Sequence, residues 1–163
     1  MKHRMAMFLL IALSAPAAPV AAQQTVVVVR HGEKLDNSKD PPLSPVGEAR
    51  ARRLADMLKA SGVKAIYTSE YRRTRELAAP LATALGIAPV AVAGAGVDAV
   101  IARIRAHGEG DTVLVVGHSN TVPQILAGLG YKGEVRVDDS EYDNLFLLVP
   151  RPGAAPTRVR LKY

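Results

Sequence analysis

The chain has 163 residues, a length that predicts one domain with a substantial core. Hydrophobic residues make up 48% and charged residues 22%, which excludes an intrinsically disordered chain. The absence of cysteine excludes disulfides, thiolate metal sites and a cysteine nucleophile. The net charge of +6 favours anionic partners. With no Trp and two Phe, the chain lacks the aromatic residues of a single-strand nucleic-acid platform, so no nucleic-acid partner is expected.

The first 22 residues have the layout of a signal peptide. Lys2 and Arg4 precede an apolar run over residues 5–15, and small side chains before Gln23 favour cleavage there. The run is shorter than the ~20 residues of a transmembrane helix, so an uncleaved anchor is the less favoured alternative. We therefore expect residues 1–22 to be removed. Residues 23–163 then form a single exported domain, periplasmic or secreted, with no membrane insertion after cleavage.

Strand and helix patterns alternate along the rest of the chain. The sequence TVVVVR at residues 25–30 lacks polar alternation, as expected of a strand buried on both faces. Ser44 followed by Pro45 favours a helix start, and Pro80 predicts a kink or break in a later helix. In chain order we expect a strand at 25–30, a helix at 45–61, a strand at 64–68, a helix at 70–85, a strand at 87–92, a helix at 97–106, a strand at 111–116, a helix at 121–129, and strands at 144–149 and 157–162. This order predicts an α/β fold with three α/β/α layers and a mostly parallel central sheet.

Two histidines follow buried strands of this sheet. His31 comes directly after the first strand, and His118 comes after the strand at 111–116. Ligands of such sheets bind beyond the carboxyl ends of the strands. A single histidine in a turn is more often structural, and that reading stays open for each of the two. Their common position at one edge favours a shared site.

Arginines gather at the same edge. Arg30 ends the first strand, and Arg72, Arg73 and Arg75 open the helix after the second. Guanidinium groups match phosphate oxygens, and the helix N-terminus beside Ser69 would add N–H donors to an anion. Neighbouring positions on a helix diverge by about 100°, so the three cannot all face one ligand. A solvated face is the alternative reading for them.

The combination of histidine and arginine suggests phosphoryl transfer. A neutral imidazole nitrogen can attack phosphorus and form a phosphohistidine. Cationic side chains would offset the charge spread over the transition state. Because arginines supply that charge, neither a metal nor another cofactor is expected.

Four segments, in order, resemble motifs of the histidine phosphatase superfamily, whose fold is the phosphoglycerate mutase-like fold. They are TVVVVRHGEK, which contains the RHG signature, PLSPVGEARARRLA, YTSEYRRTRELAAPLA and VLVVGHSNTVP. They extend over nearly all of residues 23–163. The resemblance implies that fold and a metal-independent phosphatase with a phosphohistidine intermediate.

The resemblance also implies roles for individual residues. His31 matches the phosphorylated nucleophile, and Arg30, Arg73 and His118 match the rest of the phosphate pocket. Among the helix arginines we select Arg73, because it stands four residues after Ser69, as the motif requires.

Further residues are expected to contact substrate. Asn37 matches a phosphate-contacting Asn of the mutase branch, and Ser69 and Ser119 are further substrate-binding candidates. Ser119 and Asn120 could instead cap a helix. Gly32 would let the backbone approach the phosphate closely.

The proton donor is unassigned. Ser119 stands where the acid-phosphatase branch carries its donor Asp, and the mutase branch takes its acid from a loop between the arginine helix and the late strand. The weak candidates in this chain are Asp98, Glu33, Glu141 and Asp143, with Glu109 and Asp111 less well placed. A donor is needed only for a poor leaving group such as an alkoxide. A missing acid would therefore indicate a different substrate, not an inactive enzyme.

The favoured hypothesis is an exported phosphatase acting on phosphomonoesters or phosphohistidine. Its partner would be a phosphorylated small molecule, glycan or protein side chain, in a pocket left open because no insertion is long enough for a lid domain. The loop at 34–42 is the one candidate for a movable rim. The alternatives are a phosphate- or polyanion-binding module without turnover and a structural domain of the cell envelope. Mutase activity is disfavoured, because export would remove the sugar-phosphate pool.

Overall fold

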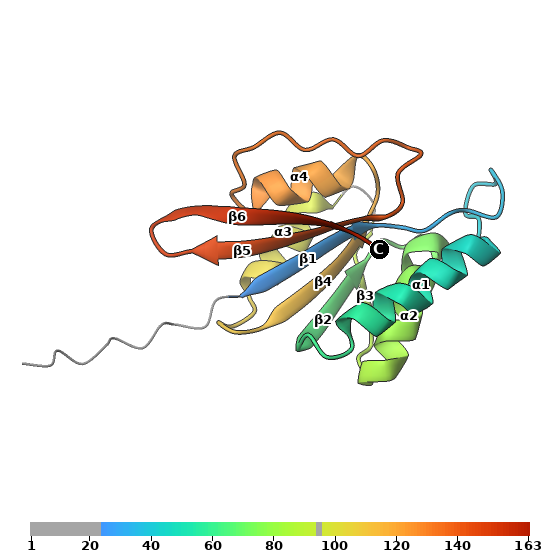
Figure 1. Cartoon of the computed structure of the whole chain (residues 1–163), viewed down its shortest axis with the longest axis horizontal. Coiled ribbons are helices and arrows are strands. Elements are labelled where there is room, and N and C mark those ends of the chain that lie inside the picture. Colours follow the sequence, from blue (N-terminus) through green and yellow to red (C-terminus); the bar gives the residue numbers. More distant parts are fainter. Residues whose placement is uncertain (1–23, 94–95) are drawn as a thin grey trace, which may run out of the picture.

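The structure, a computed structural model, describes residues 24–93 and 96–163, and the predicted signal peptide, residues 1–22, lies outside the described residues. A six-stranded sheet lies between two layers of helices (Figure 1). The elements in chain order are β1 (Thr25–Arg30), α1 (Pro45–Leu58), β2 (Val63–Thr68), α2 (Arg72–Leu85), β3 (Val90–Ala91), α3 (Val97–Arg105), β4 (Thr112–Gly117), α4 (Thr121–Gly128), β5 (Asn144–Arg151) and β6 (Ala154–Lys162). Within the described ranges, every helix is too short or too polar to cross a membrane.

The sheet is parallel on one side and antiparallel on the other. Its strand order is β3-β2-β4-β1-β5-β6, with β3, β2, β4 and β1 parallel. β5 runs antiparallel to β1, and β6 antiparallel to β5. The predicted α/β fold with a mostly parallel sheet is therefore confirmed. In the central pair, Arg30 of β1 lies opposite Gly117 of β4, so the residues that follow the two strands emerge side by side.

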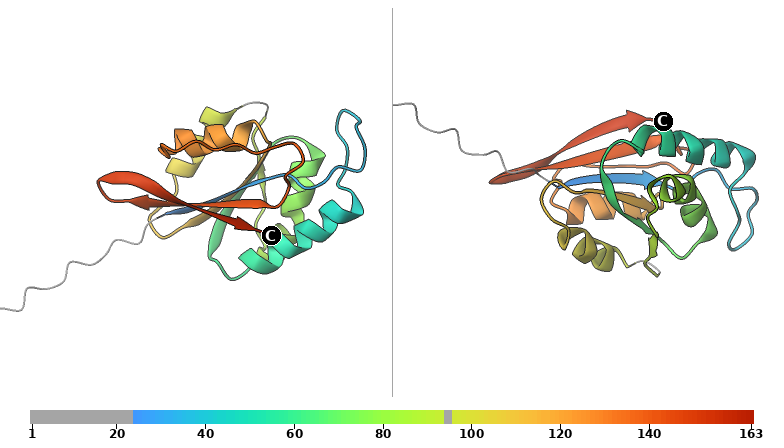
Figure 2. Two further views of the ribbon diagram at one scale, coloured as in Figure 1. Left: turned by 45° about the horizontal axis from the view of Figure 1, so that its top comes forward. Right: turned by 90° about the horizontal axis from the view of Figure 1, so that it is seen from below.

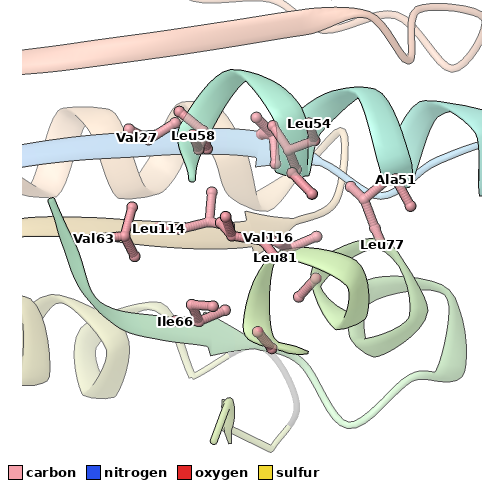
Figure 3. Close-up of a cluster of buried hydrophobic side chains, with 14 of the residues drawn as sticks. Val27, Ala51, Leu54, Leu58, Val63, Ile66, Leu77, Leu81, Leu114 and Val116 are labelled. Carbon is pink, nitrogen blue, oxygen red and sulfur yellow. The ribbon is translucent and has the colours of Figure 1, made fainter. Parts of the chain in front are cut away.

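Two helices cover each face of the sheet (Figure 2). α1 and α2 enclose one core with Val27 and Val29 of β1, and Figure 3 shows Leu54, Leu77 and Leu81 of these helices within it. α3 and α4 enclose a second core with Val26 and Val28. Successive valines of β1 thus enter opposite cores, which explains why its sequence shows no polar alternation.

α2 and β3 are two of the elements that differ from the sequence prediction. α2 is a single helix that runs through Pro80, so of the kink or break expected there the break is absent. Buried residues on both sides of Pro80, such as Leu77 and Leu81, pack on the sheet, and this packing outweighs the hydrogen bond that proline removes. β3 is restricted to Val90–Ala91, within the longer strand that we expected at residues 87–92.

The first turn of α1 packs against the segment that follows β1. A Cβ atom on Gly47 would lie 2.5 Å from the carbonyl oxygen of Glu33, and a Cβ on Gly32 would lie 3.2 Å from the Cα of Gly47. Nearby, Arg50 of α1 donates from Nη2 to the Glu33 carboxylate at 2.6 Å and from Nη1 to the carbonyl oxygen of the buried Tyr163 at 2.6 Å. The segment after β1 is thus held to α1 by close backbone contact and by an ion pair.

We predict that Gly47→Ala destabilises the protein by about 1–3 kcal/mol, because the added methyl group collides with the Glu33 backbone. Intrinsic helix propensity alone would favour alanine by up to ~1 kcal/mol, so packing and propensity predict opposite signs for the change in the free energy of unfolding. Urea unfolding of the two proteins measures the difference. Gly108→Ala is the control, because its Cβ would meet nothing closer than 3.8 Å. An unchanged or higher stability of Gly47→Ala would refute the packing account.

Candidate functional site

A cavity of about 650 Å³ lies at the carboxyl edge of β1 and β4. Its walls come from the end of β1 and the loop after it, the start of α2, the junction of β4 with α4, and the loop before β5. The lining residues are Arg30, His31, Lys34, Asn37, Tyr71, Arg73, His118, Ser119, Asn120, Thr121, Asp139 and Tyr142. All four residues expected to be catalytic are thus brought together in one cavity.

His31 presents one ring nitrogen to this cavity. The residue is 4% exposed, and its Nδ1–H donates to the carbonyl oxygen of Gly32 at 2.7 Å. A carbonyl oxygen can only accept, so Nδ1 carries the proton and Nε2 carries the lone pair. Burial, with the charge of Arg30 as a further cause, lowers the pKa of His31 to about 3. At neutral pH the ring is therefore uncharged, with Nε2 as a nucleophilic nitrogen.

His118 lies beside His31, with ring centroids 5.3 Å apart. Its Nδ1 lies 3.5 Å from Nη2 of Arg73, and its Nε2 lies 2.9 Å from Oγ of Ser69. Because the guanidinium can only donate, Nδ1 accepts and Nε2–H donates to Ser69, whose hydroxyl lies 2.9 Å from that of Thr74. Burial, followed by the charge of Arg73, lowers the pKa of His118 to about 4.

Ser69 occupies a different place from the one we expected. We predicted that it contacts substrate, but it does not line the cavity, and its hydroxyl lies between His118 and Thr74. The Thr74 hydroxyl donates in turn to the carbonyl oxygen of Tyr71 at 2.8 Å. The geometry gives Ser69 the position of a residue that orients the His118 ring.

The two arginines of the cavity are stacked on tyrosines. The guanidinium carbon of Arg30 lies 4.2 Å from the ring centroid of Tyr142, and that of Arg73 lies 4.3 Å from the ring centroid of Tyr71. Nε of each arginine is buried without a hydrogen-bond partner in the described part of the chain. A buried donor without a partner is costly, and a phosphate offers oxygens that match two guanidinium groups. The cavity is therefore suited to a phosphoryl group.

The neighbouring arginines point elsewhere, as the helical divergence predicts. Arg72 forms an ion pair with Glu76 at 2.9 Å, and Arg75 does not line the cavity. The backbone N–H of Arg72 donates to the Asp40 carboxylate at 2.8 Å. This N–H at the start of α2 is thus occupied by the protein itself, whereas we expected it to serve a bound anion.

The remaining predicted contact residues lie at the cavity. Asn37 and Lys34 both line it, with Nζ of Lys34 3.4 Å from Oδ1 of Asn37. Ser119 lines it as well and donates from Oγ to Oδ1 of Asp139 at 2.7 Å. Asn120 is the residue directly before α4, and no hydrogen bond from its side chain caps that helix.

None of the carboxylates considered as proton donors lines the cavity; these are Asp98, Glu33, Glu141, Asp143, Glu109 and Asp111. Glu33 is paired with Arg50, and Asp143 with Lys162 at 2.7 Å. The carboxylate that does line the cavity is Asp139, which the sequence analysis missed. It lies in the loop before β5. β5 runs antiparallel to β1, which brings that loop to the carboxyl edge of β1, and hydrophobic patterning carries no signal for this direction.

No group of three or more His, Asp and Glu side chains is placed to hold a metal ion within residues 24–93 and 96–163. The cationic side chains that line the cavity belong to Arg30, Arg73 and Lys34.

Sequence comparison places part of the chain in a known family. Residues 26–95 match the model of the histidine phosphatase superfamily (branch 1). The chain is 36% identical over 69 residues to a protein of Yersinia enterocolitica described as probable phosphoglycerate mutase GpmB, a match that covers 38% of this chain and 32% of the relative. It is 37% identical over 82 residues to the PE-PGRS family protein PE_PGRS11 of Mycobacterium tuberculosis, a match that covers 44% of this chain and 14% of the relative. The chain thus aligns with a third or less of these curated relatives.

Structural comparison covers nearly the whole of the fold. The protein histidine phosphatase SixA complexed with tungstate superposes with a TM-score of 0.66 at 22% identity, over 85% of this chain and 96% of that one. Phosphoserine phosphatase of Entamoeba histolytica in complex with 3-phosphoglyceric acid superposes with a TM-score of 0.63 at 14% identity. This match covers 86% of this chain and 98% of that one. The fold is therefore the one that these phosphatases share, and residues 26–95 of this chain match the histidine phosphatase superfamily in sequence.

Proposed function

We propose that the protein is a phosphatase that hydrolyses its substrate through a phosphohistidine on His31. The observation that carries the proposal is the protonation state of His31 and its position in the cavity. Its uncharged ring keeps a lone pair on Nε2, in a cavity whose walls include the guanidinium groups of Arg30 and Arg73. A nucleophile beside fixed cations is what phosphoryl transfer requires.

In the first step, Arg30 and Arg73 hold the phosphoryl oxygens and Nε2 of His31 attacks phosphorus. The new P–N bond forms as the bond to the leaving group breaks, and the electron pair of that bond departs with the leaving group. The proton on Nδ1 stays hydrogen-bonded to Gly32. The two guanidinium charges stabilise the negative charge of the transition state.

In the second step, water attacks the phosphoryl group on His31. A P–O bond forms, the P–N bond breaks, and its electron pair returns to Nε2, which releases orthophosphate and the neutral imidazole. The ring is then ready for another substrate, because burial disfavours its protonation.

His118 assists by holding the phosphate. In the free protein its Nδ1 faces Arg73 and its Nε2–H is anchored on Ser69. The ring stays neutral, so Nδ1 can accept a hydrogen bond from a protonated phosphate oxygen while Nε2–H stays on Ser69. Ser69 thus fixes the ring plane in which His118 meets the ligand.

The proposed substrates carry exposed phosphoryl groups, on a small molecule, a glycan or a protein side chain. The structural relatives include a protein histidine phosphatase and a phosphoserine phosphatase, which supports phosphohistidine and phosphomonoesters as classes. Export to the periplasm or beyond the cell is part of the proposal, and it rests on the signal-peptide pattern of residues 1–22.

A second candidate function is a phosphate- or polyanion-binding module without turnover. It is favoured by the location of the carboxylates considered as proton donors, all of which lie outside the cavity. It differs from the first candidate in needing the arginines but not Nε2 of His31.

We predict that the protein releases phosphate from an aryl phosphate in excess EDTA, and that His31→Ala lowers kcat by roughly 10³-fold or more. The control is His107→Gln, because His107 contacts Tyr67 and lies outside the cavity. Orthovanadate should bind His31→Ala, since the arginines remain. A wild type that binds vanadate but never turns over would support the binding module, and turnover that survives loss of His31 would refute the assignment of the nucleophile.

We predict that Arg73→Lys lowers kcat/KM by about 10²-fold, because lysine keeps the charge but loses the planar pair of donors. Arg75→Lys is the matched control, being a nearby arginine of α2 that does not line the cavity. Steady-state kinetics with an aryl phosphate measures both. An unchanged kcat/KM in Arg73→Lys would show that only the positive charge at this position matters and would contradict the prediction.

We predict that kcat/KM, corrected for ionisation of the substrate, stays level from pH 7 to pH 5 and falls only as pH approaches 4. The reason is that the pKa values of His31 and His118 are lowered to about 3 and about 4, so both rings stay neutral above that range. A pH–rate profile of the free enzyme tests this. A midpoint near 6.5, the ordinary value for histidine, would contradict the buried, uncharged nucleophile.

A further inference from the structure

One carboxylate lines the cavity among the described residues, and neither step above assigns it a role. Asp139 is 87% exposed on its side chain, whereas His31, in the same cavity, is 4% exposed. Asp139 therefore lies towards the solvent side of the cavity and His31 at its floor.

The carboxylate is held by two neighbours. Ser119 donates to Oδ1 of Asp139 at 2.7 Å, and Nη2 of Arg30 lies 3.5 Å from the same oxygen. Arg30 also fixes the loop itself, because its Nη1 donates to the carbonyl oxygen of Asp138 at 2.8 Å. One guanidinium thus contacts the loop, the carboxylate and the cavity, so the distance from the carboxylate to a phosphoryl group on Arg30 is set by a single side chain.

We propose that Asp139 accepts the proton of the water that hydrolyses the phosphohistidine on His31, with Ser119 as its positioning residue. This rests on the proposed phosphatase function. The attacking and leaving atoms of phosphoryl transfer lie in line through phosphorus. When His31 at the floor is the leaving group, water must approach from the solvent side, which is where Asp139 lies.

The step balances without a further reactant. The water oxygen bonds to phosphorus while one of its protons passes to the Asp139 carboxylate. The P–Nε2 bond breaks, and its electron pair returns to the His31 ring. Orthophosphate and a protonated Asp139 result, and the carboxyl group returns its proton to solvent before the next cycle.

The charge state of Asp139 fits a base. The hydrogen bond from Ser119, and then the positive charge of Arg30, hold the pKa of Asp139 below its ordinary value. The positive charge of Lys34 acts in the same direction. The group is therefore ionised at neutral pH and ready to accept a proton, but it holds none to give to a leaving group.

It follows that the favoured substrates have leaving groups that need no proton from the enzyme. A phosphohistidine whose other ring nitrogen is protonated leaves as a neutral imidazole. An aryl phosphate leaves as a stabilised phenolate. An alkyl phosphate leaves as a strongly basic alkoxide and would react slowly in the first step.

Rapid-quench kinetics with 4-nitrophenyl phosphate separates the two steps. Asp139→Asn should release the first equivalent of nitrophenolate at the wild-type rate and then turn over about 10²-fold more slowly. Phosphoenzyme, recovered after an alkaline quench, should accumulate to near one equivalent. Ser119→Ala should slow the second step several-fold, and Asp143→Asn, in a residue paired with Lys162, should leave both steps unchanged.

The other outcomes each have a meaning. A wild type that releases no nitrophenolate would refute the phosphatase proposal itself. If Asp139→Asn turned over at the wild-type rate, or if its first step were slower than that of the wild type, only the role of Asp139 would be overturned. Orthovanadate should bind Asp139→Asn at least as tightly as the wild type, because a carboxylate that competes for Arg30 is gone. Weaker binding would show that Asp139 acts in binding and would overturn the proposal as well.

Discussion

The parallel pairing of β1 with β4 is the constraint on which the site depends. Arg30 lies opposite Gly117 in this pair, and the ladder continues one step further, with the N–H of His31 donating to the carbonyl oxygen of Gly117 at 2.9 Å. Two histidines far apart in the sequence therefore meet with ring centroids 5.3 Å apart. Since both strands are buried in the cores on either side, this geometry is as rigid as the sheet.

Burial determines the protonation state of these histidines, and it also leaves buried donors near them without hydrogen-bond partners. Desolvation keeps both rings neutral, and the nearby guanidinium groups oppose protonation further. The same cavity holds two buried Nε donors, on Arg30 and Arg73, that have no partner in the described part of the chain. Stacking on Tyr142 and Tyr71 offsets part of the cost of leaving them unpaired. Both arginines also line the cavity, which places their positive charge beside the two histidines.

The sequence was sufficient for the parts of the site that follow parallel strands. His31 and His118 could be placed at one edge because each follows a buried strand, and Arg73 could be selected by its spacing from Ser69. Asp139 could not be placed, since it depends on the direction of β5 relative to β1, which hydrophobic patterning does not encode. Ser69 was placed correctly at the end of β2, but only side-chain packing shows that its hydroxyl orients His118 and does not line the cavity.

Both histidines of the cavity are neutral at neutral pH, so the nucleophile has to be distinguished by its hydrogen bonds. Nε2 of His31 is free, whereas both ring nitrogens of His118 are engaged, by Arg73 and by Ser69. The most direct test is to quench the protein in alkali during turnover of an aryl phosphate and to locate the phosphoryl group by peptide mass spectrometry. The account predicts phosphorylation at His31 alone. Phosphorylation at His118, or turnover with no phosphorylated histidine, would contradict it.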